Sequence, residues 1–303
     1  MIELIKNPKI DFMGKRIYAF IISCCVALLG LFAVIQIANG NANLGVDFAG
    51  GTAVQIKFAQ SIQLHDVRVA LEKGGLKEFD LQDLPTENKV LIRVKKQEEK
   101  IGGASETITQ VLTQGFADKK PVIDSVTEIG PKFGSRLKQD AVWATLYAIV
   151  GILAYIAFRF KFRFGVGATI ATFHDVLAVL AIFYLMGKEI NLIFLSALLT
   201  TAGYSLTDTV VVFDRVRENL KKHLREPVDV VVNRSINEVL SRTIITSVTV
   251  LLSAFALFFF GGEVLHDFSL AMILGVVIGT YSSVFIASPI AILLGKKNFR
   301  TKK

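Results

Sequence analysis

Residues 191–213, NLIFLSALLTTAGYSLTDTVVVF, form an almost unbroken apolar run that contains one acidic residue, Asp208. A helix of this length, rising about 1.5 Å per residue, is long enough to cross the roughly 30 Å hydrocarbon core of a bilayer. Five further apolar runs of comparable length lie before and after it. We therefore predict a multi-pass α-helical membrane protein with six transmembrane helices, at about residues 17–38, 141–158, 164–187, 191–213, 243–260 and 268–294.

The composition of the 303 residues agrees with this class of protein. Apolar residues make up 52% of the chain, which includes 23 Phe, and charged residues make up 20%. These values exclude a soluble enzyme, a disordered chain and a disulfide scaffold. The first run is longer than the apolar region of a cleavable signal peptide, so we expect it to remain as an anchor. The two cysteines, Cys24 and Cys25, are neighbours within this run and are expected to pack rather than to bridge.

The basic residues predict the orientation of the chain. They are concentrated in the tails at 1–16 and 296–303 and in the loops that follow the second and fourth runs, whereas the short loops on the other side contain a single one, Lys188. The positive-inside rule then places both termini in the cytoplasm. The net charge of +8 faces the cytoplasm and anionic lipid, which removes the need for a nucleic-acid partner.

Residues 39–139 are expected to form a periplasmic domain between the first helix and a five-helix domain at 140–295. The segment is large enough to bury a core of its own. Alternating apolar residues predict strands, and two stretches with helical spacing separate them, in the order β-α-β-β-α-β. This order is typical of an α+β ferredoxin-like fold. No residue pattern in the domain indicates catalysis, so a gripping or docking surface is favoured.

Two glycine-containing motifs mark the junctions of this domain with the membrane. Residues 44–52 read LGVDFAGGT and residues 129–137 read IGPKFGSRL. Glycine permits tight turns and positive φ, so the motifs predict either stiff connectors or a hinge that couples domain motion to the membrane helices. The candidate hinge residues are Gly45, Asp47, Gly50, Gly51, Gly130, Pro131 and Gly134.

Ionisable residues within the apolar runs are the strongest indication of function. An Asp at the centre of a membrane helix costs roughly 2.5–3.5 kcal/mol on insertion scales, so it is expected to have a role. Asp208 shares a polar stripe with Thr201, Tyr204 and Ser205. Arg242 begins the fifth run at a similar predicted depth, with Thr246 one turn later. If the fourth and fifth helices are neighbours, Asp208 and Arg242 are able to pair.

A carboxyl group in an apolar site retains its proton, whereas a nearby arginine favours the ionised form. Movement of Arg242 relative to Asp208 would therefore load or release a proton, which predicts a proton pathway through these residues. Asp175 lies at the middle of the third run, beside His174. The two are expected on different faces of the helix, and they belong either to the same pathway or to a packed polar pair.

In the sixth run, Gly275 and Gly279 are one turn apart. Small residues at this spacing predict close helix packing.

Taken together, these motifs resemble the SecD/SecF family of protein-export membrane proteins, within the resistance-nodulation-division superfamily. The resemblance covers essentially the whole chain and is carried by residues 45–52, 130–134, 203–215 and 241–244. One departure is Thr207, where the family commonly has Asn.

The resemblance implies a subunit of the bacterial inner membrane that is not an enzyme and that uses the proton-motive force to assist late export of unfolded preproteins. It implies SecD, the SecYEG channel and YajC as partners, protons as the coupling ion and no cofactor or metal. The proton-pathway Asp and Arg of the family correspond to Asp208 and Arg242.

Three other functions are compatible with parts of the pattern. Half of an efflux or lipid transporter of the same superfamily would share the buried Asp but should have larger external domains. A non-transporting scaffold of the translocon would not require the buried Asp. An intramembrane protease built on Ser205 and His174 is disfavoured, because residues 203–207 lack the second glycine of a nucleophile elbow.

Overall fold

The computed structural model describes residues 8–76, 79–84, 88–95 and 103–294. The chain folds into two compact units. One consists of residues 44–143, and the other, the membrane unit, is formed by the chain before and after them. The predicted C-terminal tail at 296–303 lies outside the described residues, as does the start of the N-terminal tail.

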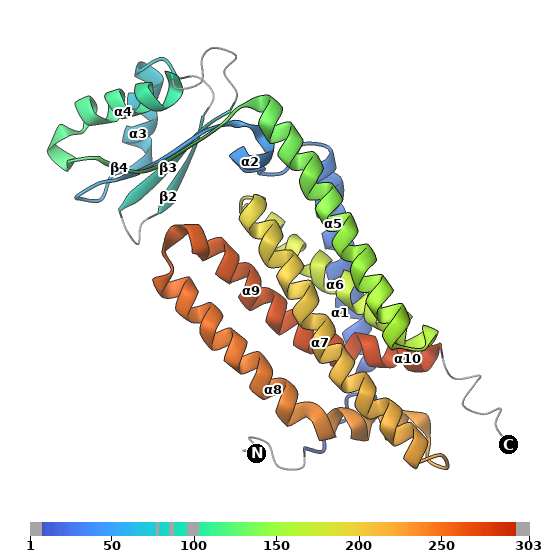
Figure 1. Ribbon diagram of the computed structural model, residues 1–303. Helices are drawn as coiled ribbons and strands as arrows, with labels where there is room; N and C mark the ends of the chain where they lie inside the picture. The colour runs from blue at the N-terminus through green and yellow to red at the C-terminus, as the bar shows by residue number, and fades with distance from the viewer. Residues whose placement is uncertain (1–7, 77–78, 85–87, 96–102, 295–303) are drawn as a thin grey trace. The chain divides into compact units, whose positions relative to one another are not determined.

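The unit at 44–143 has two helices on one face of a four-stranded antiparallel sheet (Figure 1). Its elements are α2 (Val46–Ala49), β1 (Gly51–Lys57), α3 (Leu64–Lys73), β2 (Phe79–Leu84), β3 (Lys89–Lys95), α4 (Gly103–Gly115), the short 3-10 helix Ala117–Lys119 and β4 (Val122–Ile129). The strand order β2-β3-β1-β4 is that of the ferredoxin-like fold. The alternation in β1 buries Val54 and Ile56 against Val67, Leu71 and Ile108 of the two helices.

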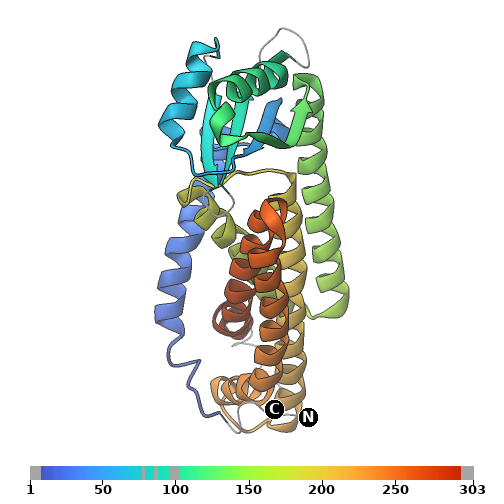
Figure 2. The same cartoon turned by 90° about the vertical axis from the view of Figure 1, so that its left-hand side faces the viewer.

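Within the described residues, six helices are long and apolar enough to cross a membrane. They are α1 (Arg16–Ala38), α5 (Pro131–Arg159), α6 (Phe162–Leu185), α7 (Leu192–Lys222), α8 (Val228–Phe260) and a last span in which α9 (Gly262–Ser282), a π-helical turn (Ser283–Ala287) and α10 (Ser288–Leu293) follow one another. With the four-stranded sheet, they confirm the predicted fold class. The helices α7, α8 and α9 run alongside one another (Figure 1 and Figure 2).

Several helices extend beyond the apolar runs that predicted them. The helix α5 begins at Pro131 rather than 141, α7 continues to Lys222 rather than 213, and α8 begins at Val228 rather than 243. Hydropathy marks only the part of a helix that suits lipid, whereas polar residues continue the helix outside it. The π-helical turn had no signal in the apolar pattern.

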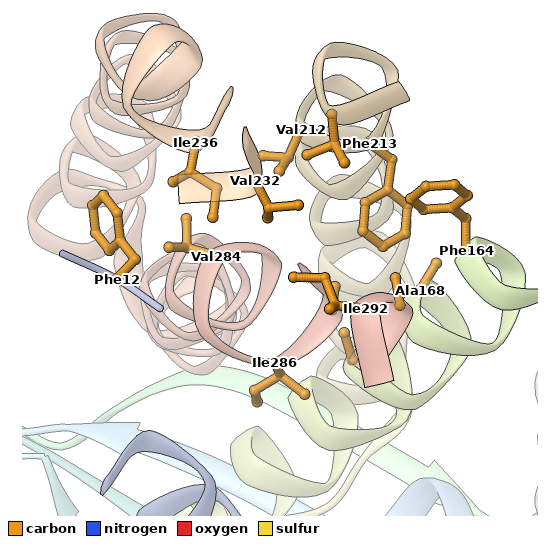
Figure 3. Packing of buried hydrophobic residues seen from close by; sticks show 14 of the residues in the cluster. Phe12, Phe164, Ala168, Val212, Phe213, Val232, Ile236, Val284, Ile286 and Ile292 are labelled. Atoms are coloured by element: carbon orange, nitrogen blue, oxygen red, sulfur yellow. The ribbon is translucent and has the colours of Figure 1, made fainter. Parts of the chain in front are cut away.

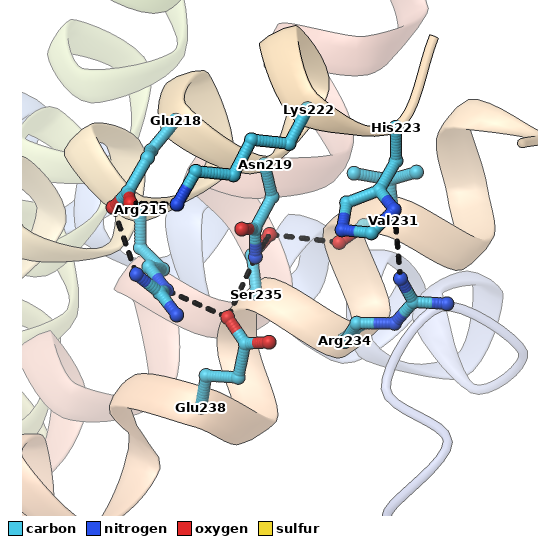
Figure 4. A network of polar contacts seen from close by, with 9 residues as sticks. All are labelled: Arg215, Glu218, Asn219, Lys222, His223, Val231, Arg234, Ser235 and Glu238. Carbon is cyan, nitrogen blue, oxygen red and sulfur yellow. Dashed lines mark hydrogen bonds and ion pairs between the residues drawn. The ribbon is translucent and has the colours of Figure 1, made fainter. Parts of the chain in front are cut away.

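The polar extensions of α7 and α8 form a network of ion pairs and hydrogen bonds, which we call the polar bracket (Figure 4). Arg215 Nε lies 2.6 Å from Glu238 Oε2, and Asn219 Nδ2 donates to Ser235 Oγ at 3.0 Å. Oε2 of Glu226, in the connecting loop, lies 2.6 Å from Nη2 of Arg234 in α8. These hydrogen bonds with Arg234 hold the pKa of Glu226 below its ordinary value of 4.5.

The apolar core of the membrane unit joins α6, α7, α8 and the last span. Phe164 and Phe213 pack with ring centroids 5.1 Å apart, and Val212, Ile236 and Val284 lie in the same cluster (Figure 3).

The N-terminal tail is docked onto this core by α8. Phe12 is buried in the cluster, and its backbone N–H donates to Asn233 Oδ1 at 2.8 Å. The backbone N–H of Ile10 donates to Asn237 Oδ1 at 3.0 Å. Two Asn side chains of one helix face thus satisfy backbone groups near the start of the chain.

Candidate functional site

The predicted polar stripe of α7 faces the last span across an unusually short separation. A Cβ atom added at Gly275 would lie 2.4 Å from Thr201 Cγ2, and one added at Gly279 would lie 2.8 Å from Ser205 Cβ. Both distances are too short for any residue larger than glycine. The glycine spacing therefore gives the close helix packing that the sequence predicts, and it buries Thr201 and Ser205.

Asp175 of α6 lies at the meeting point of three helices. Its side chain is 3% exposed. Oδ2 accepts hydrogen bonds from Ser205 Oγ of α7 and from Ser282 Oγ of α9, the latter at 2.7 Å. Oδ1 lies 3.0 Å from Nδ1 of His174. We call this group the carboxylate clasp.

The sequence predicts His174 and Asp175 on different faces of the helix, and their polar atoms nevertheless lie within hydrogen-bonding distance, as in the packed polar pair that the sequence also allows. Adjacent residues point about 100° apart on a helix, but both side chains bend over the helix surface far enough for their polar atoms to meet.

Asp208 of α7 forms a second buried site, on the side that faces α8. Only 5% of Asp208 is exposed. Thr246 and Ser247 of α8 are the hydroxyl residues that face its carboxyl. Among the described residues, Asp208 Oδ2 has no hydrogen-bond partner. A buried carboxyl oxygen without a partner is costly, which makes Asp208 a candidate functional residue.

Neighbouring hydroxyl groups extend this second site. Tyr204 Oη donates to Ser247 Oγ at 3.3 Å, and Ser247 Oγ lies 2.7 Å from Thr280 Oγ1 of α9. Thr246 Oγ1 is held within its own helix by the carbonyl of Arg242, at 3.2 Å. Sequence reasoning included Tyr204 and Thr246 but missed Ser247, Thr280 and Ser282. The last two follow the glycine stripe of the sixth run directly, which is the signal that could have identified them.

Arg242 lies near Asp208 but is not bonded to it. The charge of Arg242 acts on the carboxyl of Asp208 over some distance. No salt bridge joins these two described residues, and the side chains that face the carboxyl are those of Thr246 and Ser247. The structure therefore brings the predicted pair onto neighbouring helices in an unpaired arrangement.

The two junction motifs pack against each other through their glycines. A Cβ atom at Gly50, which has φ of +71°, would lie 3.0 Å from Pro131 Cα. One at Gly134 would lie 2.9 Å from the backbone nitrogen of Gly50 and 3.4 Å from the carbonyl oxygen of Asp47. Gly51 also has positive φ, whereas Gly45 and Gly130 precede the helices α2 and α5. The motifs form one close-packed junction, and their action as a hinge stays a prediction.

Comparisons with known protein families match most of the chain. The model described as "Protein export membrane protein SecD/SecF, C-terminal" matches residues 108–297, and the "SecD/SecF GG Motif" model matches residues 43–62.

Named relatives match over nearly the full length. The chain is 60% identical, over 98% of its length and 99% of the relative, to "Protein translocase subunit SecF" of Thermodesulfovibrio yellowstonii. It is 42% identical to the protein of the same name from Endomicrobium trichonymphae, with 94% and 91% covered.

The crystal structure of SecDF, a translocon-associated membrane protein from Thermus thermophilus, matches with a TM-score of 0.84 and 34% identity. That match covers 96% of this chain but only 39% of the SecDF chain.

Proposed function

The chain belongs to the SecD/SecF family of protein-export membrane proteins, and on that premise we propose that it uses the proton-motive force to assist translocation of unfolded preproteins. It is a protein translocase subunit of the SecF type and a multi-pass protein of the bacterial inner membrane. In this proposal both termini are cytoplasmic, and the complex contains SecD and associates with SecYEG and YajC.

The observation that carries the proposal is the unpartnered Oδ2 of Asp208 within the helix bundle. A negative charge on the unpartnered Oδ2 has no hydrogen bond among the described residues to stabilise it. A protonated carboxyl group carries no charge, and a shift of Arg242 would supply a partner for the ionised form. Asp208 therefore has two favourable arrangements that differ by one proton and by the position of Arg242. Each proton that crosses the membrane field supplies roughly 2.3 kcal/mol per 100 mV, which is able to drive alternation between them.

A second, related set of membrane helices is expected to complete the transporter. Transporters of this architecture use two related halves, with the coupling site between them. The chain covers 39% of the SecDF chain that it matches, which leaves room there for another half. We assign that half to SecD.

Export into inverted vesicles, measured with and without a proton gradient, tests the proposal. Asp208→Asn and Arg242→Met should each abolish the gradient-dependent part of export, because one removes the exchangeable proton and the other the charge that controls it. Complex assembly should be unaffected. Thr207→Ala is the matched control, since Thr207 is exposed and its hydroxyl donates to the carbonyl of Gly203 in its own helix. Wild-type, gradient-dependent export by Asp208→Asn would refute the proposal and favour a passive scaffold.

A further inference from the structure

We infer that Asp175 is a positioning residue, whose carboxyl group holds α6, α7 and α9 together and so sets the direction in which α7 presents Asp208. The role of Asp208 in proton exchange rests on the proposed function, whereas the carboxylate clasp is argued from its contacts alone. The sequence leaves two roles open for Asp175, a member of the proton path or part of a packed polar pair. We assign it to the packed polar pair, whose role is to hold the three helices together.

The two buried carboxyl groups differ in how their oxygens are used. Both oxygens of Asp175 have partners, and these come from α6, α7 and α9. Oδ2 of Asp208 has none among the described residues. A group that exchanges a proton with each cycle needs partners that change, whereas a group with every oxygen engaged is suited to hold its neighbours in place.

Ser205 links the clasp to Asp208. Its side chain lies between the carboxyl of Asp175 and Gly279, where even a methyl group would be 2.8 Å from Ser205 Cβ. Rotation of α7 about its own axis would break this contact and collide with α9. Because Ser205 precedes Asp208 by less than one turn, fixing its direction also fixes Asp208 towards Thr246 and Ser247.

Ser282 links the clasp to the π-helical turn of the last span. It is the final residue of α9, and the turn Ser283–Ala287 follows directly. At the far end of the turn, a Cβ atom at Gly167 of α6 would lie 2.8 Å from the carbonyl oxygen of Ala287, the last residue of the turn, and 3.3 Å from the backbone nitrogen of Ala291 beyond it. Asp175 and Gly167 are eight residues apart, or about 12 Å along α6. Helix α6 therefore holds the last span on both sides of its irregular turn, a feature often found at functional sites.

Replacing Asp175 by Asn distinguishes a role in holding the helices together from a role in proton exchange. The oxygen of an Asn side chain is able to accept from Ser205 and Ser282, while its NH2 group donates to Nδ1 of His174 in the other tautomer. Every contact of the clasp is then retained without a titratable group. Leucine has the same branching but bulkier methyl groups and no acceptor, so it would remove the oxygen that Ser205 and Ser282 share, and Ser282 would retain only the carbonyl of Gly279.

The test compares Asp175→Asn, Asp175→Leu and the double variant Ser205→Ala/Ser282→Ala in the full-length protein within its complex. Asp175→Asn should keep gradient-driven export within about twofold of wild type, with an unchanged pH profile and an unchanged thermal unfolding midpoint in detergent. Asp175→Leu should lower gradient-driven export about tenfold and should lower the midpoint. The double variant should resemble Asp175→Leu. Adding Asp175→Leu to the double variant should have little further effect, because the residues act as one unit.

Loss of gradient-driven export in Asp175→Asn overturns the inference. At an unchanged midpoint the titratable group itself would be required, and at a lower midpoint the hydrogen bonds that Asn retains would not be what holds the helices. Wild-type export and midpoint in Asp175→Leu also overturn it. The unfolding midpoints report on the clasp even if wild-type export proves independent of the gradient. In that case the proposed function fails while the clasp is still tested.

Discussion

Gly279 of α9 shows at the scale of one residue how the bundle depends on close packing. A Cβ atom there would lie 2.8 Å from Ser205 Cβ and 3.3 Å from its Cα, so the backbone of α7 would have to move. Gly279→Ala should therefore destabilise the membrane unit by about 1–3 kcal/mol, the usual cost of overpacking. Gly151→Ala in α5 is the control, because no atom of a described residue outside its own helical turn lies within 4 Å of its added Cβ. Thermal unfolding in detergent should separate the two, and equal midpoints would contradict the packing argument.

Glu226 offers a prediction about pH. Its pKa is lowered in the folded protein, chiefly by the hydrogen bonds with Arg234, so its contribution to stability is present above about pH 4.5 and is lost as the pH falls through the folded pKa. Glu226→Gln should lower the unfolding midpoint slightly at pH 7, and the difference from wild type should shrink below pH 4.5. A difference that stays constant down to pH 3 would show that the ion pair is not its source.

Individual site residues were predictable from sequence where an ionisable group interrupts an apolar run. Asp208, Arg242 and Asp175 stand out because lipid makes charge expensive. Their partners do not stand out in this way, since Ser247, Thr280 and Ser282 are hydroxyl residues that membrane helices tolerate. Which hydroxyl meets which carboxyl depends on the rotation of each helix, and the apolar pattern of one helix alone leaves that rotation open.

At the scale of elements, the junction motifs act as one packed structure. Gly134→Ala would place a methyl group 2.9 Å from the backbone nitrogen of Gly50. A backbone atom cannot rotate out of the way as the end of a side chain can. We expect this variant to lose about 1–3 kcal/mol of stability in the unit at 44–143. Gly130→Ala, four residues earlier, meets no atom within 4 Å and should be close to neutral. Limited proteolysis of the full-length protein measures both, and equal resistance would argue against a packed junction.

The strands and the existence of all six long helices followed from periodicity and length, but the helix ends did not. The polar bracket illustrates the reason. Arg215, Asn219, Ser235 and Glu238 are helical because they bond across from α7 to α8, and these contacts have no counterpart in a hydropathy pattern. The π-helical turn packs closely against Gly167, a contact that likewise has no counterpart in a hydropathy pattern.

At the scale of the whole molecule, the distribution of basic residues predicts that the domain at 44–143 and the α7–α8 loop lie on opposite sides of the membrane. Single cysteines at Gln114 and Arg225, in a Cys24→Ala/Cys25→Ala background, test this in intact cells whose outer membrane is made permeable. Both positions are exposed. A membrane-impermeant maleimide should label Gln114→Cys and should reach Arg225→Cys only after the inner membrane is opened. Labelling of Arg225→Cys before that would reverse the proposed orientation.

The docking of Ile10 and Phe12 on Asn233 and Asn237 bears on biosynthesis. These contacts join residues more than 220 positions apart. Ile10 and Phe12 leave the ribosome long before Asn233 and Asn237 are synthesised. The N-terminal segment therefore has no docking partner while four later helices are being inserted. Truncated nascent chains that stop before residue 233 should therefore leave this end open to proteases, and completion of α8 should be the event that closes it.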